Sequence, residues 1–256
     1  MPQLPFSPAL GTPFIELKSI DSTNNYALQQ VHAGMAQHGT AFFAHEQVAG
    51  KGQRGKAWSM EKGVNLILST VIDPHPLALP QQFQLSVCVA LAASDLFGRY
   101  AGEDTRIKWP NDLYWQDRKA GGILIENIIG GGHEWKWAVA GVGININQTQ
   151  FPEMVKNPVS LKQITGKNFN AIDLAKEFCS LLDDRFRTLY TSGFDTLYDL
   201  YLSRLYKKGA IVKLKKNNRV FEAIIKTVTR EGVLITEHGI EEEFRTGEVE
   251  WVMEKR

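Results

Sequence analysis

Hydrophobic residues follow two different spacings along this chain, and their alternation predicts a mixed α and β domain. Short apolar runs rich in β-branched residues predict strands, and they are found at FIELKSI (14–20), TAFFAHEQ (40–47), VNLILSTVI (64–72), GGILIENII (121–129) and WKWAVAGVGINI (135–146). The last two runs are bounded by glycine, so we expect them to pair within one sheet.

Longer stretches place an apolar residue at every third or fourth position, which predicts helices. The first helix is expected to begin at Asp21, Ser22 and Thr23, whose side-chain oxygens can cap it, and to run through Val31. The others are expected from about 80 to 98, from Asn170 to Leu189, and from Phe194 to Gly209. Asn170 supplies a cap oxygen at the start of its helix, and Gly209 ends the last one. The main domain is therefore expected to contain helices as well as strands.

From Ala210 onward the chain changes to short strands separated by turn signals. The expected strands are AIVKLK (210–215), VFEAIIKTV (220–228), GVLITEH (232–238), IEEEFR (240–245) and VEWVM (249–253). Asn-Asn, Glu-Gly and His-Gly pairs lie between several of them, and such pairs favour turns. This spacing predicts a small closed β-barrel, which divides the chain into a main domain of residues 1–208 and a C-terminal domain of residues 209–256.

Composition narrows the class of protein. The 256 residues carry 29 basic and 28 acidic side chains, a formal net charge of +1, so the overall charge does not call for a polyanion such as DNA. Cys88 and Cys179 are the only cysteines and lie in apolar helical stretches, which argues against a disulfide framework and favours a reducing cytoplasm. No run reaches the roughly 18 apolar residues of a membrane span. We expect a cytoplasmic protein without a membrane segment.

The stretch AGKGQRGKAW (49–58) places three glycines beside Lys51, Arg54 and Lys56. It resembles the phosphate-binding pattern G-x-x-x-x-G-K-[ST], but Ala57 replaces the hydroxyl that ligates Mg²⁺ and a strand follows instead of a helix. The glycines let backbone N–H groups approach an anion, and the cations can neutralise it. This glycine loop is therefore either an anion-binding element of another kind or a turn whose charges face water.

A second unusual stretch is KWPNDLYWQDRKAGGILIE (108–126). Asn111 and Asp112 follow a proline and are expected to form a turn at the end of a strand. Lys119 comes just before a pair of glycines that opens the next strand, and from there a lysine can reach a reacting centre. The alternative is a hairpin lysine in water, which is the more common environment for lysine.

Taken together, these stretches resemble the biotin protein ligases. The segments that carry the resemblance, in the same order as in that family, are DSTN (21–24), EQVAGKGQRGKAW (46–58), KWPNDLY with the following RKAGGILIE (108–126), and GVGININ (141–147). The resemblance to the catalytic part of the family covers about residues 14–205. The C-terminal barrel is similar to the SH3-like domain that follows this part.

The resemblance implies an α/β fold related to the catalytic core of class II aminoacyl-tRNA synthetases, with a mixed sheet backed by helices. It also implies that ATP and biotin, with Mg²⁺, give biotinyl-5′-AMP and pyrophosphate, and that a lysine of a biotin carboxyl carrier protein then takes the biotinyl group. A carboxylate repels the triphosphate that it attacks, so such a site must neutralise several negative charges and exclude water. A homodimer is among the assemblies that the resemblance allows.

The same resemblance implies which residues contact biotin. They are Ser22, Thr23, Asn24, Gln47, Gly50, Lys51, Trp58, Lys119 and Gly122. Among them, Ser22, Thr23 and Gln47 are expected to hydrogen-bond the ring system, and Trp58 is expected to close the pocket. Gly122 lets the backbone approach the ligand because no side chain intervenes. Ser22 and Thr23 are also read as a plain helix cap, and the two roles can coexist.

The nucleotide is expected to contact Lys51, Gln53, Arg54, Lys56, Trp58, Lys119 and Asn145. The implied catalytic residues are Lys119, Arg54 and Asp112, with Lys119 placed against the biotin carboxylate and the α-phosphate. Asn145 is expected near the phosphates and their metal. Asp112 is expected either to ligate Mg²⁺ or to orient the incoming lysine amine.

The glycine loop departs from the usual family form, G-R-G-R-x-G-R. Lys51, Gln53 and Lys56 stand where arginine is usual. Arginine binds phosphate through paired hydrogen bonds, whereas lysine acts as a point charge. We therefore expect this loop to retain the adenylate less tightly, or to hold it mainly through Arg54. The segment NPVSLKQITG (157–166) offers no aromatic residue to stack on adenine, and the adenine pocket stays unassigned.

Other functions fit the sequence less well. Only 20 residues precede DSTNN, too few for the DNA-binding domain of bifunctional family members, so a monofunctional ligase that does not bind DNA is expected. The nearest alternative is a lipoate or octanoate ligase, which shares the fold, but the Trp-Pro-Asn-Asp segment and the glycine loop favour biotin. A non-catalytic nucleotide- or nucleic-acid-binding module would use the basic run 207–219, which the acidic residues 241–243 balance.

Overall fold

The computed structural model describes residues 8–58, 60–153 and 155–253. Its larger part is built on a seven-stranded sheet with the strand order β1-β2-β3-β7-β6-β5-β4. The strands are β1 (Phe14–Leu17), β2 (Ala41–Ala44), β3 (Leu66–Ile72), β4 (Thr105–Lys108), β5 (Asp112–Trp115), β6 (Arg118–Ile129) and β7 (Trp135–Ile144). The β1–β2 pair is parallel and the other pairs are antiparallel, so the sheet is mixed, as expected.

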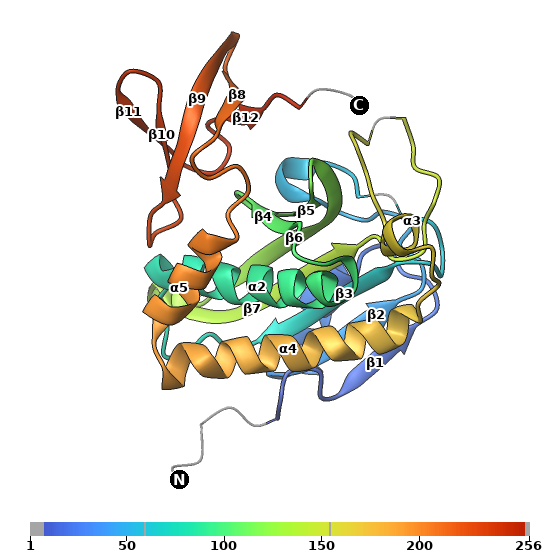
Figure 1. The fold of residues 1–256 in the computed structure, drawn as a ribbon. Coiled ribbons are helices and arrows are strands. Elements are labelled where there is room, and N and C mark those ends of the chain that lie inside the picture. Colours follow the sequence, from blue (N-terminus) through green and yellow to red (C-terminus); the bar gives the residue numbers. More distant parts are fainter. Residues whose placement is uncertain (1–7, 59, 154, 254–256) are drawn as a thin grey trace.

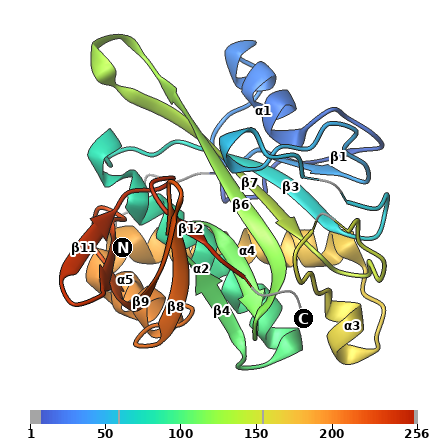
Figure 2. The ribbon, with the colours of Figure 1, turned by 90° about the horizontal axis from the view of Figure 1, so that it is seen from above.

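Helices cover both faces of this sheet (Figures 1 and 2). They are α1 (Thr23–His32), α2 (Gln82–Ala101), α3 (Leu161–Thr165), α4 (Ala171–Thr191) and α5 (Phe194–Ser203). Because successive strand residues point to opposite faces, Phe42 packs in a cluster with Ala27 of α1, while its neighbour Phe43 belongs to the main core with α2 and α4. In the part of the chain that the structure describes, no helix is long and apolar enough to cross a membrane.

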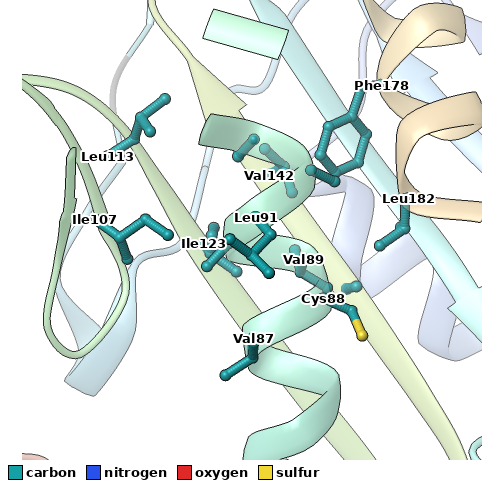
Figure 3. Close-up of a cluster of buried hydrophobic side chains, with 14 of the residues drawn as sticks. Val87, Cys88, Val89, Leu91, Ile107, Leu113, Ile123, Val142, Phe178 and Leu182 are labelled. Atoms are coloured by element: carbon teal, nitrogen blue, oxygen red, sulfur yellow. The ribbon is translucent and has the colours of Figure 1, made fainter. Parts of the chain in front are cut away.

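The main core lies between α2, α4 and the sheet. Figure 3 shows Val87 and Leu91 of α2 among side chains from the strands and from Phe178 and Leu182 of α4. Asn170 caps α4 through its side-chain oxygen, which accepts from the backbone N–H groups of residues 172 and 173, as the sequence predicts. Helices α2 and α4 thus cover one face of the sheet. On the opposite face, α1 covers only part of the surface, and the candidate site lies beyond the start of this helix.

The C-terminal strands form a second sheet beside β4 and β5 (Figure 1). They are β8 (Ile211–Lys216), β9 (Arg219–Val228), β10 (Leu234–Glu237), β11 (Glu241–Phe244) and β12 (Glu250–Trp251), in the order β11-β10-β9-β8-β12. The Trp109 indole donates to the Gly232 carbonyl oxygen (2.9 Å) and the Tyr198 hydroxyl to that of Val228 (2.5 Å). These bonds attach the second sheet to α5 and to the turn that follows β4.

The structure differs from the sequence-based expectation in several details. The C-terminal ladder is open among the described residues, with β11 and β12 as its edges, where a closed barrel was expected. Asp112 does not lie in a turn; residues 109–111 make the turn, and Asp112 begins β5 opposite Lys108. Ser22 stands at the N-cap position of α1, but its side chain makes no capping hydrogen bond. The short helix α3 was not predicted.

Candidate active site

A row of glycines and polar residues lies on the face of the sheet that α1 partly covers. Residues paired across neighbouring strands share a face, and the register pairs Ser69 with Gly141, Gly143 with Gly122, and Gly122 with Asp112. The row therefore crosses four strands, from β3 through β7 and β6 to β5. We call Gly122, Gly141 and Gly143 the glycine floor.

A polar cluster stands at one end of the floor, where α1 begins. It consists of Thr23, Asn24, Gln47 and Ser69. The Thr23 backbone N–H and hydroxyl both donate to Gln47 Oε1, at 2.7 and 3.0 Å, and Ser69 Oγ lies 2.7 Å from Thr23 Oγ1 and 2.6 Å from Asn24 Oδ1. Thr23, Asn24 and Ser69 are buried. Ser69, which the sequence did not single out, thus links Thr23 with Asn24, and Thr23 in turn holds Gln47.

The amide of Asn24 is fixed from the opposite side by β6. Its Nδ2 donates to the Leu124 carbonyl oxygen (3.2 Å) and to Glu126 Oε2 (2.8 Å). A Cβ atom on Gly141 would lie 2.9 Å from Cγ of Asn24 and collide with its amide. Gly141 therefore provides the room in which Asn24 packs, a role that follows from strand register and not from any local sequence pattern.

The glycine loop folds back over the floor. The Trp58 backbone N–H donates to the Gly50 carbonyl oxygen (2.8 Å), so the loop closes as a narrow hairpin. The Trp58 indole lies against the floor, where a Cβ atom on Gly122 would come within 3.3 Å of Cζ3. Its Nε1 is buried without a hydrogen-bond partner among the described residues, and Lys119 Nζ lies 5.2 Å from the ring centroid.

The cations of the glycine loop point to different neighbours. Lys51 Nζ donates to Asn25 Oδ1 (2.6 Å) at the start of α1. Arg54 has left-handed backbone geometry (φ 58°) at the tip of the loop, and its guanidinium packs against Gly247, between β11 and β12. Lys56 is exposed and acts electrostatically on Lys108. The loop therefore spreads its charges along the site instead of gathering them at one point.

Asp112 is held between two lysines at the other end of the floor. Lys119 Nζ lies 2.5 Å from Asp112 Oδ1, and Lys108 Nζ lies 3.6 Å from Oδ2. Burial lowers the pKa of Lys108 to about 8, although the Asp112 carboxylate opposes this shift. Asp112 and Lys119, two of the predicted site residues, thus pair across neighbouring strands, and Lys108 joins them as a third member that the sequence did not reveal.

Asn145 anchors the strand that carries Lys119. Its Nδ2 donates to the carbonyl oxygens of Lys119 (3.3 Å) and Val159 (3.1 Å). The described residues hold no cluster of three or more His, Cys, Asp or Glu side chains suited to a metal, and both oxygens of Asp112 already face lysines. Mg²⁺ prefers six oxygen ligands, so Asp112 and Asn145 do not form a metal site by themselves.

Comparison with known proteins places these features in a family. Residues 16–145 match the biotin/lipoate A/B protein ligase family. The bifunctional ligase/repressor BirA of Escherichia coli is 31% identical over 91% of this chain and 72% of its own length. The biotin–[acetyl-CoA-carboxylase] ligase of Paracoccus denitrificans is 33% identical over 86% of this chain and 92% of its own.

Solved structures show the same fold. The biotin protein ligase of Aquifex aeolicus in complex with biotin and ATP superposes with a TM-score of 0.77 at 24% identity, covering 94% of this chain and 98% of that one. The match includes the C-terminal strands as well as the main sheet, since so little of either chain is left out. With the sequence matches above, this chain belongs to the biotin/lipoate A/B protein ligase family.

Proposed function

We propose that this chain is an ATP-dependent biotin protein ligase, which forms biotinyl-5′-AMP and transfers the biotinyl group to a lysine of a biotin carboxyl carrier protein. The observation that carries the proposal is the position of the Lys119–Asp112 pair at one end of a glycine floor whose other end holds the Thr23–Gln47 cluster. The relative from Paracoccus denitrificans, a biotin–[acetyl-CoA-carboxylase] ligase, supports the choice of substrate.

The two ends of the floor suit the two ends of biotin. Biotin has a polar ureido head and a carboxylate, joined by an apolar ring and chain. The polar cluster supplies hydroxyl and amide groups for the head, and the floor offers bare backbone with the Trp58 ring above it. The buried indole N–H of Trp58 is a donor free for a ligand oxygen, as far as the described residues go.

In the first step a biotin carboxylate oxygen attacks the α-phosphorus of ATP, and the bond to pyrophosphate breaks. The two reactants repel each other, and Lys119 is placed to stabilise the charge that develops between them. ATP brings Mg²⁺ with it as part of the substrate. Lys51, Arg54 and Lys56 on the loop are proposed to hold the phosphates, with Trp58 excluding water from the mixed anhydride.

In the second step the neutral amine of the acceptor lysine attacks the carbonyl carbon of the anhydride, and AMP leaves. Asp112 is engaged by lysines on both oxygens, so we assign it to holding Lys119 in place and not to binding the metal. Both cysteines are free and buried, and burial raises their pKa to about 12. Such thiols suit the reducing cytoplasm in which we propose that the protein acts.

The test is biotin-dependent exchange of pyrophosphate into ATP by the purified protein, followed by transfer of labelled biotin to a carrier domain. Lipoate is the matched control acid. A site that pairs the ureido group is expected to reject a ligand without it by roughly 10⁴. Exchange with lipoate and none with biotin would assign the chain to the lipoate branch of the family instead.

A further inference from the structure

Lys108, the last residue of β4, is a buried cation outside the predicted set. Its side chain is 8% exposed, and its ammonium group lies 5.1 Å from the ring centroid of Tyr114 and 4.9 Å from that of Trp251. Tyr206 packs on both aromatic side chains, at centroid distances of 5.0 and 5.7 Å. Lys108 therefore lies in an aromatic cage that opens toward Asp112.

Both sheets contribute aromatic residues to the cage. Tyr114 belongs to β5 of the main sheet, whereas Trp251 belongs to β12 at the edge of the C-terminal sheet. The ring faces attract the ammonium group electrostatically and restrict its position. The side chain of Trp251 thus brings the C-terminal sheet to the Lys108–Asp112 end of the candidate active site.

The charge of the site depends on Lys108. Lys119 and Asp112 alone form a pair with no net charge, whereas Lys108, Asp112 and Lys119 together carry a net charge of +1. The substrates of the proposed reaction are anions, so the extra charge favours their binding. Lys108 also faces Oδ2 of Asp112, so that Oδ1 of the same carboxylate is available to hold Lys119.

We propose that Lys108 is a positioning residue for nucleotide activation: its cage, completed by Trp251, holds the ammonium group against Asp112, so that Asp112 orients Lys119 while the three side chains keep a positive charge toward the phosphates. This inference rests on the proposed function. It adds that the C-terminal sheet takes part in the first step, by way of the cage.

The test compares Lys108→Met, Lys108→Arg and the control Lys136→Met, which removes one charge from an exposed position on β7. Pyrophosphate exchange gives the KM values for ATP and biotin. Loss of a group that orients a functional side chain typically costs about 10- to 100-fold, so Lys108→Met is expected to raise the KM for ATP by about that factor with little change in the KM for biotin. Lys108→Arg should restore most of the ATP affinity, and Lys136→Met should match the wild type.

The pH profile supplies a readout that a purely structural lysine would not change. Lys108 is faced by Asp112 and Tyr114 on β5, Lys119 on β6 and Lys56 in the glycine loop. It loses its proton as the pH rises through about 8. The wild-type kcat/KM for ATP is therefore expected to fall above that pH, whereas Lys108→Arg keeps its charge and should not show this fall.

Trp251→Leu provides a second test of the proposal, because it opens the cage and leaves Lys108 in place. It too is expected to raise the KM for ATP. A wild-type KM for ATP and an unchanged pH profile in Lys108→Met, or in Trp251→Leu if the first variant does not fold, would overturn the proposal. Absence of any biotin-dependent exchange in the wild type would instead remove the proposed function, so the two failures are distinct.

Discussion

Trp58 lies so close to Gly143 that a Cβ atom on the glycine would come within 2.7 Å of Cε2 of the indole. The ring rests directly on the backbone of β7, and any larger residue at this position must displace it. Gly143 therefore controls whether the glycine loop can close against the sheet.

Gly143→Ala is expected to lift Trp58 from the floor and weaken biotin binding. Overpacking of this kind typically costs about 1–3 kcal/mol, and calorimetric titration with biotin measures the loss. Gly131→Ala is the matched control, since nothing lies within 4 Å of its added Cβ atom. Equal biotin affinities in the two variants would show that closure by Trp58 does not depend on Gly143.

Lys119→Ala should fold normally and lose adenylate formation. Removal of one preorganised charge donor typically costs about 10²- to 10³-fold in rate, and Lys108 can still balance Asp112 in the variant. Pyrophosphate exchange measures the rate and a thermal melt checks the fold. Turnover at the wild-type rate would show that Lys119 does not act on the reacting groups.

Ser69→Ala tests the polar cluster. The change leaves Asn24 Oδ1 and Thr23 Oγ1 without the serine hydroxyl, which lies 2.6 and 2.7 Å from them. A buried polar group deprived of its partner costs about 1–3 kcal/mol, so both the free energy of unfolding in urea and the affinity for biotin should fall. Ser203→Ala, at an exposed position on α5, should change neither.

Lys108→Met is expected to separate stability from activity. Removing one partner of a buried ion pair typically costs about 3–5 kcal/mol, because the remaining charge loses its counterpart. Asp112 keeps Lys119 as a partner at 2.5 Å in the variant, so the loss of stability at pH 7 should stay well below that figure while the affinity for ATP falls. A large loss of stability would point to a structural role.

The same residue gives a pH dependence of known sign. The pKa of Lys108 is about 8 in the folded protein, below the ordinary value of 10.5, so between these values the unfolded chain binds more protons than the folded one. Its contribution therefore raises stability with increasing pH through this window and leaves no such slope below it. The unfolding free energies of the wild type and Lys108→Met are measured across this pH window. The stability of the wild type relative to the variant should increase as the pH rises.

Much of the fold followed from local pattern. Most of the strands and the long helices were predicted because apolar spacing is a local property, and Asn170 proved to be the cap of α4. The strand β5 was not predicted, and α5 ends at Ser203 instead of at Gly209. The short helix α3 was missed although its signal is present, since Ser160 and Gln163 form a reciprocal capping box.

The site was less predictable, because part of it arises from contacts between distant segments. Ser69 lies within an apolar strand, and only its pairing with Gly141 places it beside Thr23 and Asn24. Lys108 belongs to a recognised motif, but its role depends on Trp251, near the other end of the chain. Local patterns contain no information about such pairs.

The glycine floor has a consequence for how such a protein can change. A surface made of bare backbone has no side chains to exchange, and a methyl group on Gly141 or Gly143 would strike a neighbouring side chain. A protein of this kind that accepted a different acid would therefore have to change its glycine loop or the polar residues at the two ends of the site, while the glycine floor between them stays the same.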